Sequence, residues 1–239
     1  MPTTFSTLPE VGIQADPKPM VWTAEEYHRL HDLDFFLDQR VELIGGEIIG
    51  SDLTKPRRWT ADELYRLLDL GFFLNQRVEL IGGEILVMAS QKNFHYAAIV
   101  LTADALRAAF GPGFWVREQA SLDLSPLSVP DPDIAVVPGS ARHAAAQNPT
   151  SALLTTEVSE TTLAYDRGTK ASLYAAADIP DYWIVNLVHR QLEVHRNPVA
   201  DTSQPFGWRY ADVTILGLAD FVSPLAAHHA RIAVADVLP

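Results

Sequence analysis

The sequence contains no cysteine, which excludes disulfide bonds, thiolate metal sites and a cysteine nucleophile. No apolar run approaches the roughly 18 to 20 residues that a membrane-spanning helix needs. The N-terminus has neither the basic stretch nor the apolar stretch of a secretory signal peptide. We therefore expect a soluble, cytoplasmic protein that has no membrane partner.

Positive charge is scarce as well. The chain has 30 Asp and Glu against 18 Lys and Arg, a net charge of −12. This argues against a protein that coats nucleic acid non-specifically, because such proteins neutralise phosphates with basic side chains. It leaves room for a nuclease whose bound metal ion supplies the positive charge. The apolar content of 48% over 239 residues is enough for a substantial core.

An internal repeat marks the N-terminal part. Copy 1 (residues 22–49) and copy 2 (residues 59–86) are identical at 21 of 28 positions, with a constant offset of 37 residues. The second residue of each copy is a Thr, followed three residues later by Glu, which is the signature of a capping box. Each copy also contains a Gly-Gly pair between two apolar runs. The repeat predicts two helix–hairpin units, with helices that end near Leu33 and Leu70.

The two copies are connected differently to the rest of the chain. Copy 2 continues directly into an apolar segment, whereas copy 1 ends in a polar stretch. We predict an N-terminal tail at 1–21, a duplicated helix–hairpin unit at 22–52 and a main domain at 57–239. Copy 1 either docks in place of copy 2, within one chain or across a dimer, or packs as an inert surface flap.

Beyond the repeat, helices and strands interleave with hairpins, which favours a mixed α/β sheet over a purely parallel one. The patterns predict helices at 94–110 and 166–177, and strands at 114–118, 121–124, 134–137, 153–159, 182–187, 191–196 and 208–215, with residues 231–238 closing the chain.

Two carboxylates lie on neighbouring apolar strands of this pattern. Asp133 precedes one strand, and Glu157 lies within the next, where a charge is costly without a partner or a metal. If the strands pair, the two side chains converge on one face, a donor set that suits a hard cation such as Mg²⁺. Asp131 also follows a proline, but the strand phase favours Asp133.

Lysine is rare: it occurs only at positions 18, 55, 92 and 170. Lys170 lies about one turn into the predicted helix that follows the Glu157 strand, and helical side chains tilt towards the N-terminus, so its ammonium can reach the strand end. The alternative is a surface pair with Asp166 at i,i+4 spacing. Spacing alone favours the surface pair.

Two further residues are candidates for this cluster. Glu79 is a charge inside an apolar strand of copy 2, and His95 opens the long helix at 94–110. A histidine at a helix end either binds a carboxylate or metal, or is simply solvated.

In combination, these residues resemble a known family. The segments that carry the likeness are Val78-Glu79-Leu80-Ile81-Gly82-Gly83-Glu84-Ile85, Pro132-Asp133-Ile134, Glu157-Val158-Ser159, Tyr165-Asp166-Arg167-Gly168 with Lys170 and Tyr174, and the two closing segments at 179–186 and 192–198. They are similar to the Uma-two family of restriction endonucleases, within the PD-(D/E)xK nuclease superfamily, over roughly residues 59–239.

The resemblance implies a restriction-endonuclease-like fold, a mixed β-sheet flanked by helices, and phosphodiester hydrolysis that depends on Mg²⁺ or Mn²⁺. It implies that Asp133 and Glu157 bind the metal and that Glu79 is an accessory acid. The superfamily's usual lysine position, two residues after Glu157, is Ser159 here. The resemblance therefore assigns the lysine's role to Lys170, and His95 remains an accessory candidate.

Two functions follow as hypotheses. The first is a metal-dependent endonuclease whose partner is nucleic acid, in particular DNA, with a homodimer suited to cutting two strands. The second is a catalytically inactive descendant that keeps the fold as a binding or assembly module, which the acidic charge favours.

Overall fold

The computed structural model describes residues 16–50, 55–142 and 147–239, and the chain divides into two compact units. The first unit contains Asn93–Phe110 and Leu154–Pro239, and the second contains Pro17–Lys92 and Gly111–Leu153. Most of the predicted tail at 1–21, and residues 51–54 of the predicted linker, lie outside the described residues. Among the described residues, no helix combines the length and the apolarity required to cross a bilayer.

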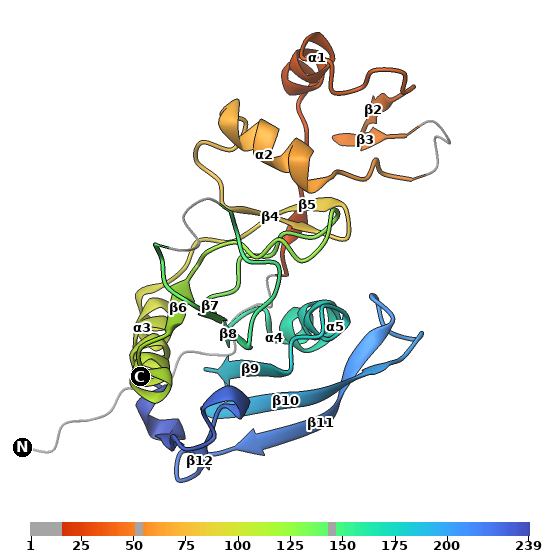
Figure 1. Ribbon diagram of the computed structural model, residues 1–239. Helices are drawn as coiled ribbons and strands as arrows, with labels where there is room; N and C mark the ends of the chain where they lie inside the picture. The colour runs from red at the N-terminus through yellow and green to blue at the C-terminus, as the bar shows by residue number, and fades with distance from the viewer. Residues whose placement is uncertain (1–15, 51–54, 143–146) are drawn as a thin grey trace, which may run out of the picture. The chain divides into compact units, whose positions relative to one another are not determined.

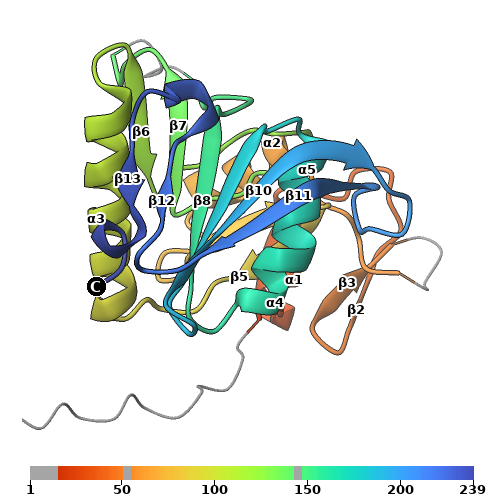
Figure 2. The ribbon, with the colours of Figure 1, turned by 90° about the horizontal axis from the view of Figure 1, so that it is seen from below.

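The first unit is built on four strands, β8 to β11, which lie side by side in chain order (Figures 1 and 2). β8 pairs in parallel with β9, whereas β9–β10 and β10–β11 are antiparallel, so the sheet is mixed, as predicted. The strands are β8 (Leu154–Ser159), β9 (Asp181–Asn186), β10 (Gln191–Ala200), β11 (Trp208–Leu216), and the short pair β12 (Phe221–Val222) and β13 (Ile232–Ala233).

The helices of the first unit pack on these strands. α5 packs against β10 and β11, and α3 packs against β8. The helical elements are α3 (Asn93–Phe110), α4 (Leu163–Tyr165), the π-helical turn η1 (Asp166–Lys170), α5 (Ala171–Ala176), and the 3-10 turns η2 (Leu225–Ala227) and η3 (Val234–Asp236).

The predicted helix at 166–177 was wrong in its start and in its geometry. The helical segment begins at Leu163, and its middle turn, η1, is π-helical rather than α-helical. The Thr162 hydroxyl donates to the Asp166 carboxylate at 2.6 Å, which orders the turn ahead of the predicted start.

In the second unit both copies form a helix followed by a hairpin. Thr23 and Thr60 cap their helices in complete capping boxes, and the helices end at Asp32 and Asp69, as the repeat predicts. The elements are β1 (Lys18–Pro19), α1 (Ala24–Asp32), β2 (Glu42–Ile44), β3 (Glu47–Ile49), α2 (Ala61–Asp69), β4 (Val78–Ile81), β5 (Glu84–Val87), β6 (Phe114–Glu118) and β7 (Ile134–Pro138).

Copy 2 is bonded to the rest of the second unit. The backbone of Leu80 in β4 exchanges two hydrogen bonds with Val129, and Gly83 donates to the Leu127 carbonyl at 2.7 Å. The predicted strand at 121–124 is absent from the structure. Leu122 donates to the Pro130 carbonyl and Asp123 to the Pro149 carbonyl, so these groups bond to loops instead of forming a ladder.

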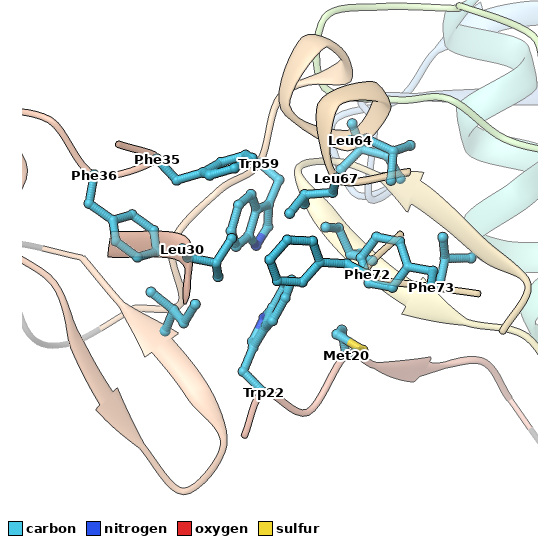
Figure 3. Packing of buried hydrophobic residues seen from close by; sticks show 14 of the residues in the cluster. Met20, Trp22, Leu30, Phe35, Phe36, Trp59, Leu64, Leu67, Phe72 and Phe73 are labelled. Atoms are coloured by element: carbon cyan, nitrogen blue, oxygen red, sulfur yellow. The ribbon is translucent and has the colours of Figure 1, made fainter. Parts of the chain in front are cut away.

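One hydrophobic core is shared by the two copies. Figure 3 shows Trp22 and Trp59 at its centre, with phenylalanines of both copies around them. The members that each copy contributes are Trp22, Leu30, Phe35, Phe36, Val41 and Ile48 from copy 1, and Trp59, Leu64, Leu67, Phe72, Phe73, Val78, Leu80 and Ile85 from copy 2. Copy 1 is thus an integral layer of this core.

Candidate active site

The central residue of the candidate site in the first unit is Glu157. It lies in β8, whose six residues are all buried. Its Oε1 accepts a hydrogen bond from the Lys170 ammonium at 3.1 Å and another from the Tyr174 hydroxyl at 2.6 Å. A buried carboxylate is costly unless it is paired and hydrogen-bonded, and here two donors from one helical segment meet it.

Lys170 and Tyr174 reach Glu157 because they are four residues apart and share one helical face. Lys170 ends η1 and is only 1% exposed. Single turns of π-helix occur often at functional sites. The interpretation of Lys170 as a solvated surface pair with Asp166 is wrong, since Asp166 is also only 4% exposed.

Asp166 is a carboxylate that the sequence reasoning missed. Burial, followed by the negative charge of Glu157, raises its pKa well above the usual aspartate range, although Thr162, Lys170 and Ser159 act in the opposite direction. Asp166 was visible in the Asp-x3-Lys-x3-Tyr spacing, but its burial depends on how the helix packs and could not be deduced from spacing.

Another buried carboxylate, Glu193, faces the same side of the sheet as Glu157. Both are in register with Ile184 of β9, which lies between them. Arg167 donates to both carboxylate oxygens of Glu193, at 2.8 and 2.7 Å, and Asn186 donates to Oε1 at 2.6 Å. Sequence reasoning missed this pair, because Arg167 and Glu193 are separated by 26 positions.

The pKa of Glu193 shows that these donors stabilise its charge. Burial raises the pKa, but the His195 imidazole, 3.9 Å from Oε2, and the hydrogen bonds from Arg167 and Asn186 outweigh burial and bring the pKa below the usual glutamate range. Glu193 is therefore an ionised group that holds the exposed Arg167 side chain against the sheet.

Asp133 and Glu79 are both placed in the second unit, and both are buried. Asp133 directly precedes β7, and its Oδ1 accepts from the Gln91 amide at 3.3 Å. Asp131 is less buried, and its backbone carbonyl accepts from Arg77. The two aspartates of the Pro-Asp-Pro-Asp run thus have different surroundings.

The duplication does not reproduce the acidic candidate of copy 2. Glu79 in β4 is 1% exposed, whereas the side chain of its counterpart Glu42 in β2 is 43% exposed. Copy 2 alone places this glutamate in a buried environment.

His95 lies in the first turn of α3 and is half-buried. The structure thus brings Glu157 and Lys170 together in one unit and places Glu79 and Asp133 in the other. Within the described residues, no cluster of three or more His, Asp or Glu side chains has the arrangement of a metal site. The metal-binding role of Asp133 and Glu157 accordingly remains a prediction.

Comparison with known proteins identifies relatives. Residues 61–234 match the model of the Uma2 family, described as "Putative restriction endonuclease". The fold matches a crystal structure described as a putative nuclease belonging to DUF820 from Anabaena variabilis, with a TM-score of 0.52 and 14% identity, over 74% of this chain and 96% of that one. No curated protein matches the sequence.

Proposed function

The chain belongs to the Uma2 family, and from this premise we propose that it is a metal-dependent endonuclease that hydrolyses phosphodiester bonds in DNA. The observation that carries the proposal is the buried contact of Lys170 and Tyr174 with one oxygen of Glu157. Burying an ammonium and a carboxylate together seldom stabilises a fold more than apolar residues would, so the presence of this pair favours a chemical role.

The side-chain types of the two predicted ligands suit a divalent cation. Asp133 and Glu157 are both buried, and carboxylate oxygens are the ligands that Mg²⁺ and Mn²⁺ prefer. These two residues would hold the ion, which supplies an activated water and neutralises charge on the phosphate.

The remaining candidate side chains have separate roles in this proposal. The Lys170 ammonium, which donates to Glu157 at 3.1 Å, would orient a water or stabilise the charge that builds on a phosphate oxygen. Tyr174 holds the Glu157 carboxylate in place through its 2.6 Å hydrogen bond. Glu79 would assist as a further acid, and His95 is retained as an accessory candidate.

The first test is a cleavage assay on purified full-length protein with plasmid, linear duplex, single-stranded DNA and RNA, each in Mg²⁺, Mn²⁺ or chelator. We expect metal-dependent cleavage of DNA, which falls about 100-fold or more in Asp133→Ala and in Lys170→Met. The four substrates establish which nucleic acid is cut.

The chain supplies matched controls for this assay. Asp131→Asn changes the other aspartate of the same run, and Glu42→Gln changes the exposed counterpart of Glu79. We expect both variants to keep wild-type activity, while Glu79→Gln loses most of it. If the wild type cleaves nothing and binds neither Mg²⁺ nor Mn²⁺ by calorimetry, the enzyme proposal fails and a binding module takes its place.

A further inference from the structure

The contacts between copy 1 and copy 2 are reciprocal. Arg29 in α1 donates to the Leu70 carbonyl of copy 2, and its guanidinium lies 4.4 Å from the centre of the Phe72 ring. The equivalent Arg66, 37 positions later, donates to the Leu33 carbonyl of copy 1 and lies 4.3 Å from the Phe35 ring centre. Each contact is thus made twice, with the roles of the copies exchanged.

The aromatic core repeats the same exchange. Trp22 and Trp59 occupy equivalent positions at the centre of the cluster (Figure 3), and their ring centroids lie 5.1 Å apart. Trp22 contacts Phe72 and Phe73 of copy 2, whereas Trp59 contacts the equivalent pair of copy 1, Phe35 and Phe36.

The segments that precede the two copies are exchanged as well. The backbone N–H of Met20 donates to the Ile85 carbonyl of copy 2 at 2.8 Å, and the N–H of Arg57 donates to the Ile48 carbonyl of copy 1 at 2.7 Å. Pro19 pairs with Leu86, and the equivalent Pro56 pairs with Ile49. In each of these four pairs of equivalent positions, the residue numbers again differ by 37.

Such reciprocity is the signature of an isologous contact, in which one surface patch pairs with an identical patch about a two-fold axis. We infer that Lys55–Leu86 carries a self-complementary docking surface, and that copy 1 occupies it within the same chain in place of a second chain. The partner that this surface fits is another copy of the same helix–hairpin unit. The family match begins at residue 61, so copy 1 lies outside the segment shared with the family.

The test uses full-length protein in which copy 1 has lost its half of the contacts. In the double variant Trp22→Ala/Arg29→Glu, copy 2 becomes available, and two chains pair through it. Sedimentation equilibrium should show a mass about twofold that of the wild type, since an isologous contact closes as a dimer. Adding Arg66→Glu, which removes the copy 2 half, should return the mass to that of one chain.

Arg40→Glu is the matched control. It makes the same change at another arginine of copy 1, Arg40, whose side chain is 75% exposed. It should leave the mass unchanged. If circular dichroism shows that the double variant does not fold, we would use Trp22→Leu/Arg29→Gln, which keeps an apolar side chain in the core. The mass of this variant is then measured by sedimentation equilibrium at increasing protein concentration. A dimer that Arg66→Glu abolishes supports the inference; a folded monomer at every concentration overturns it.

Discussion

At the scale of single residues, the site in the first unit depends on charges taken out of water. Lys170 and Glu157 are both buried, and their side chains meet at 3.1 Å. The mutual attraction of such a pair offsets its loss of hydration only while both members are present. The stability of the first unit is therefore sensitive to the removal of either charge alone.

Lys170→Met should destabilise the protein by about 3–5 kcal/mol, because it removes the ammonium that faces a buried carboxylate. The double variant Lys170→Met/Glu157→Gln should recover much of that loss, since neither charge then remains. Urea unfolding at neutral pH measures both effects. Lys18→Met, at an exposed position, is the control and should change little; a Lys170→Met variant as stable as the wild type would contradict the argument.

At the scale of elements, the two hairpins depend on their Gly-Gly turns. Gly45 and Gly46 of copy 1, and Gly82 and Gly83 of copy 2, all have positive φ, as the predicted hairpin turn requires. At Gly83 there is a second constraint, because a Cβ would lie 2.9 Å from the Cβ of Arg58.

Gly83→Ala should therefore destabilise the protein by about 1–3 kcal/mol, through the left-handed backbone and the clash with Arg58 together. Gly45→Ala is the matched control. It has positive φ but nothing within 4 Å of a new Cβ, so only the backbone cost of about 1 kcal/mol applies. Thermal unfolding compares the Tm of the two variants with that of the wild type. An equal decrease in Tm would show that the clash with Arg58 does not add to the backbone cost at Gly83.

At the scale of the whole molecule, acid stability depends on ionised glutamates in both units. In the second unit, burial raises the pKa of Glu63, but hydrogen bonds from Arg57 and Thr60 outweigh it and lower the pKa. In the first unit, Glu193 is held below its usual pKa range by His195, Arg167 and Asn186.

A carboxylate whose pKa is lower in the folded than in the unfolded state contributes stability above its unfolded pKa. That stability is lost as pH falls through the folded value. We expect the urea midpoint of the wild type to fall steadily from the ordinary glutamate range downwards. Glu193→Gln should be less stable at neutral pH and show a flatter acid dependence, whereas Glu25→Gln, exposed in α1, should follow the wild type. If the urea midpoints of Glu193→Gln and the wild type depend on pH in the same way, this carboxylate is not a source of the acid dependence.

The sequence by itself determined the features that depend on neighbours within a few residues. The capping boxes at Thr23 and Thr60 and the Gly-Gly turns are local hydrogen-bonding and backbone preferences, so the helix–hairpin copies were predictable with their boundaries. A charge inside an apolar strand likewise identified Glu157 as buried and costly.

Tertiary structure alone decided which distant groups meet. The spacing of Asp166 and Lys170 alone favours a surface pair, and only the packing of this helical segment on the sheet buries both residues. The loop bonds that replace the predicted strand at 121–124 come from residues 130 and 149. The reciprocal contacts of the two copies join residues 33 to 41 positions apart, such as Arg66 with Leu33 and Arg29 with Leu70, which local patterns do not encode.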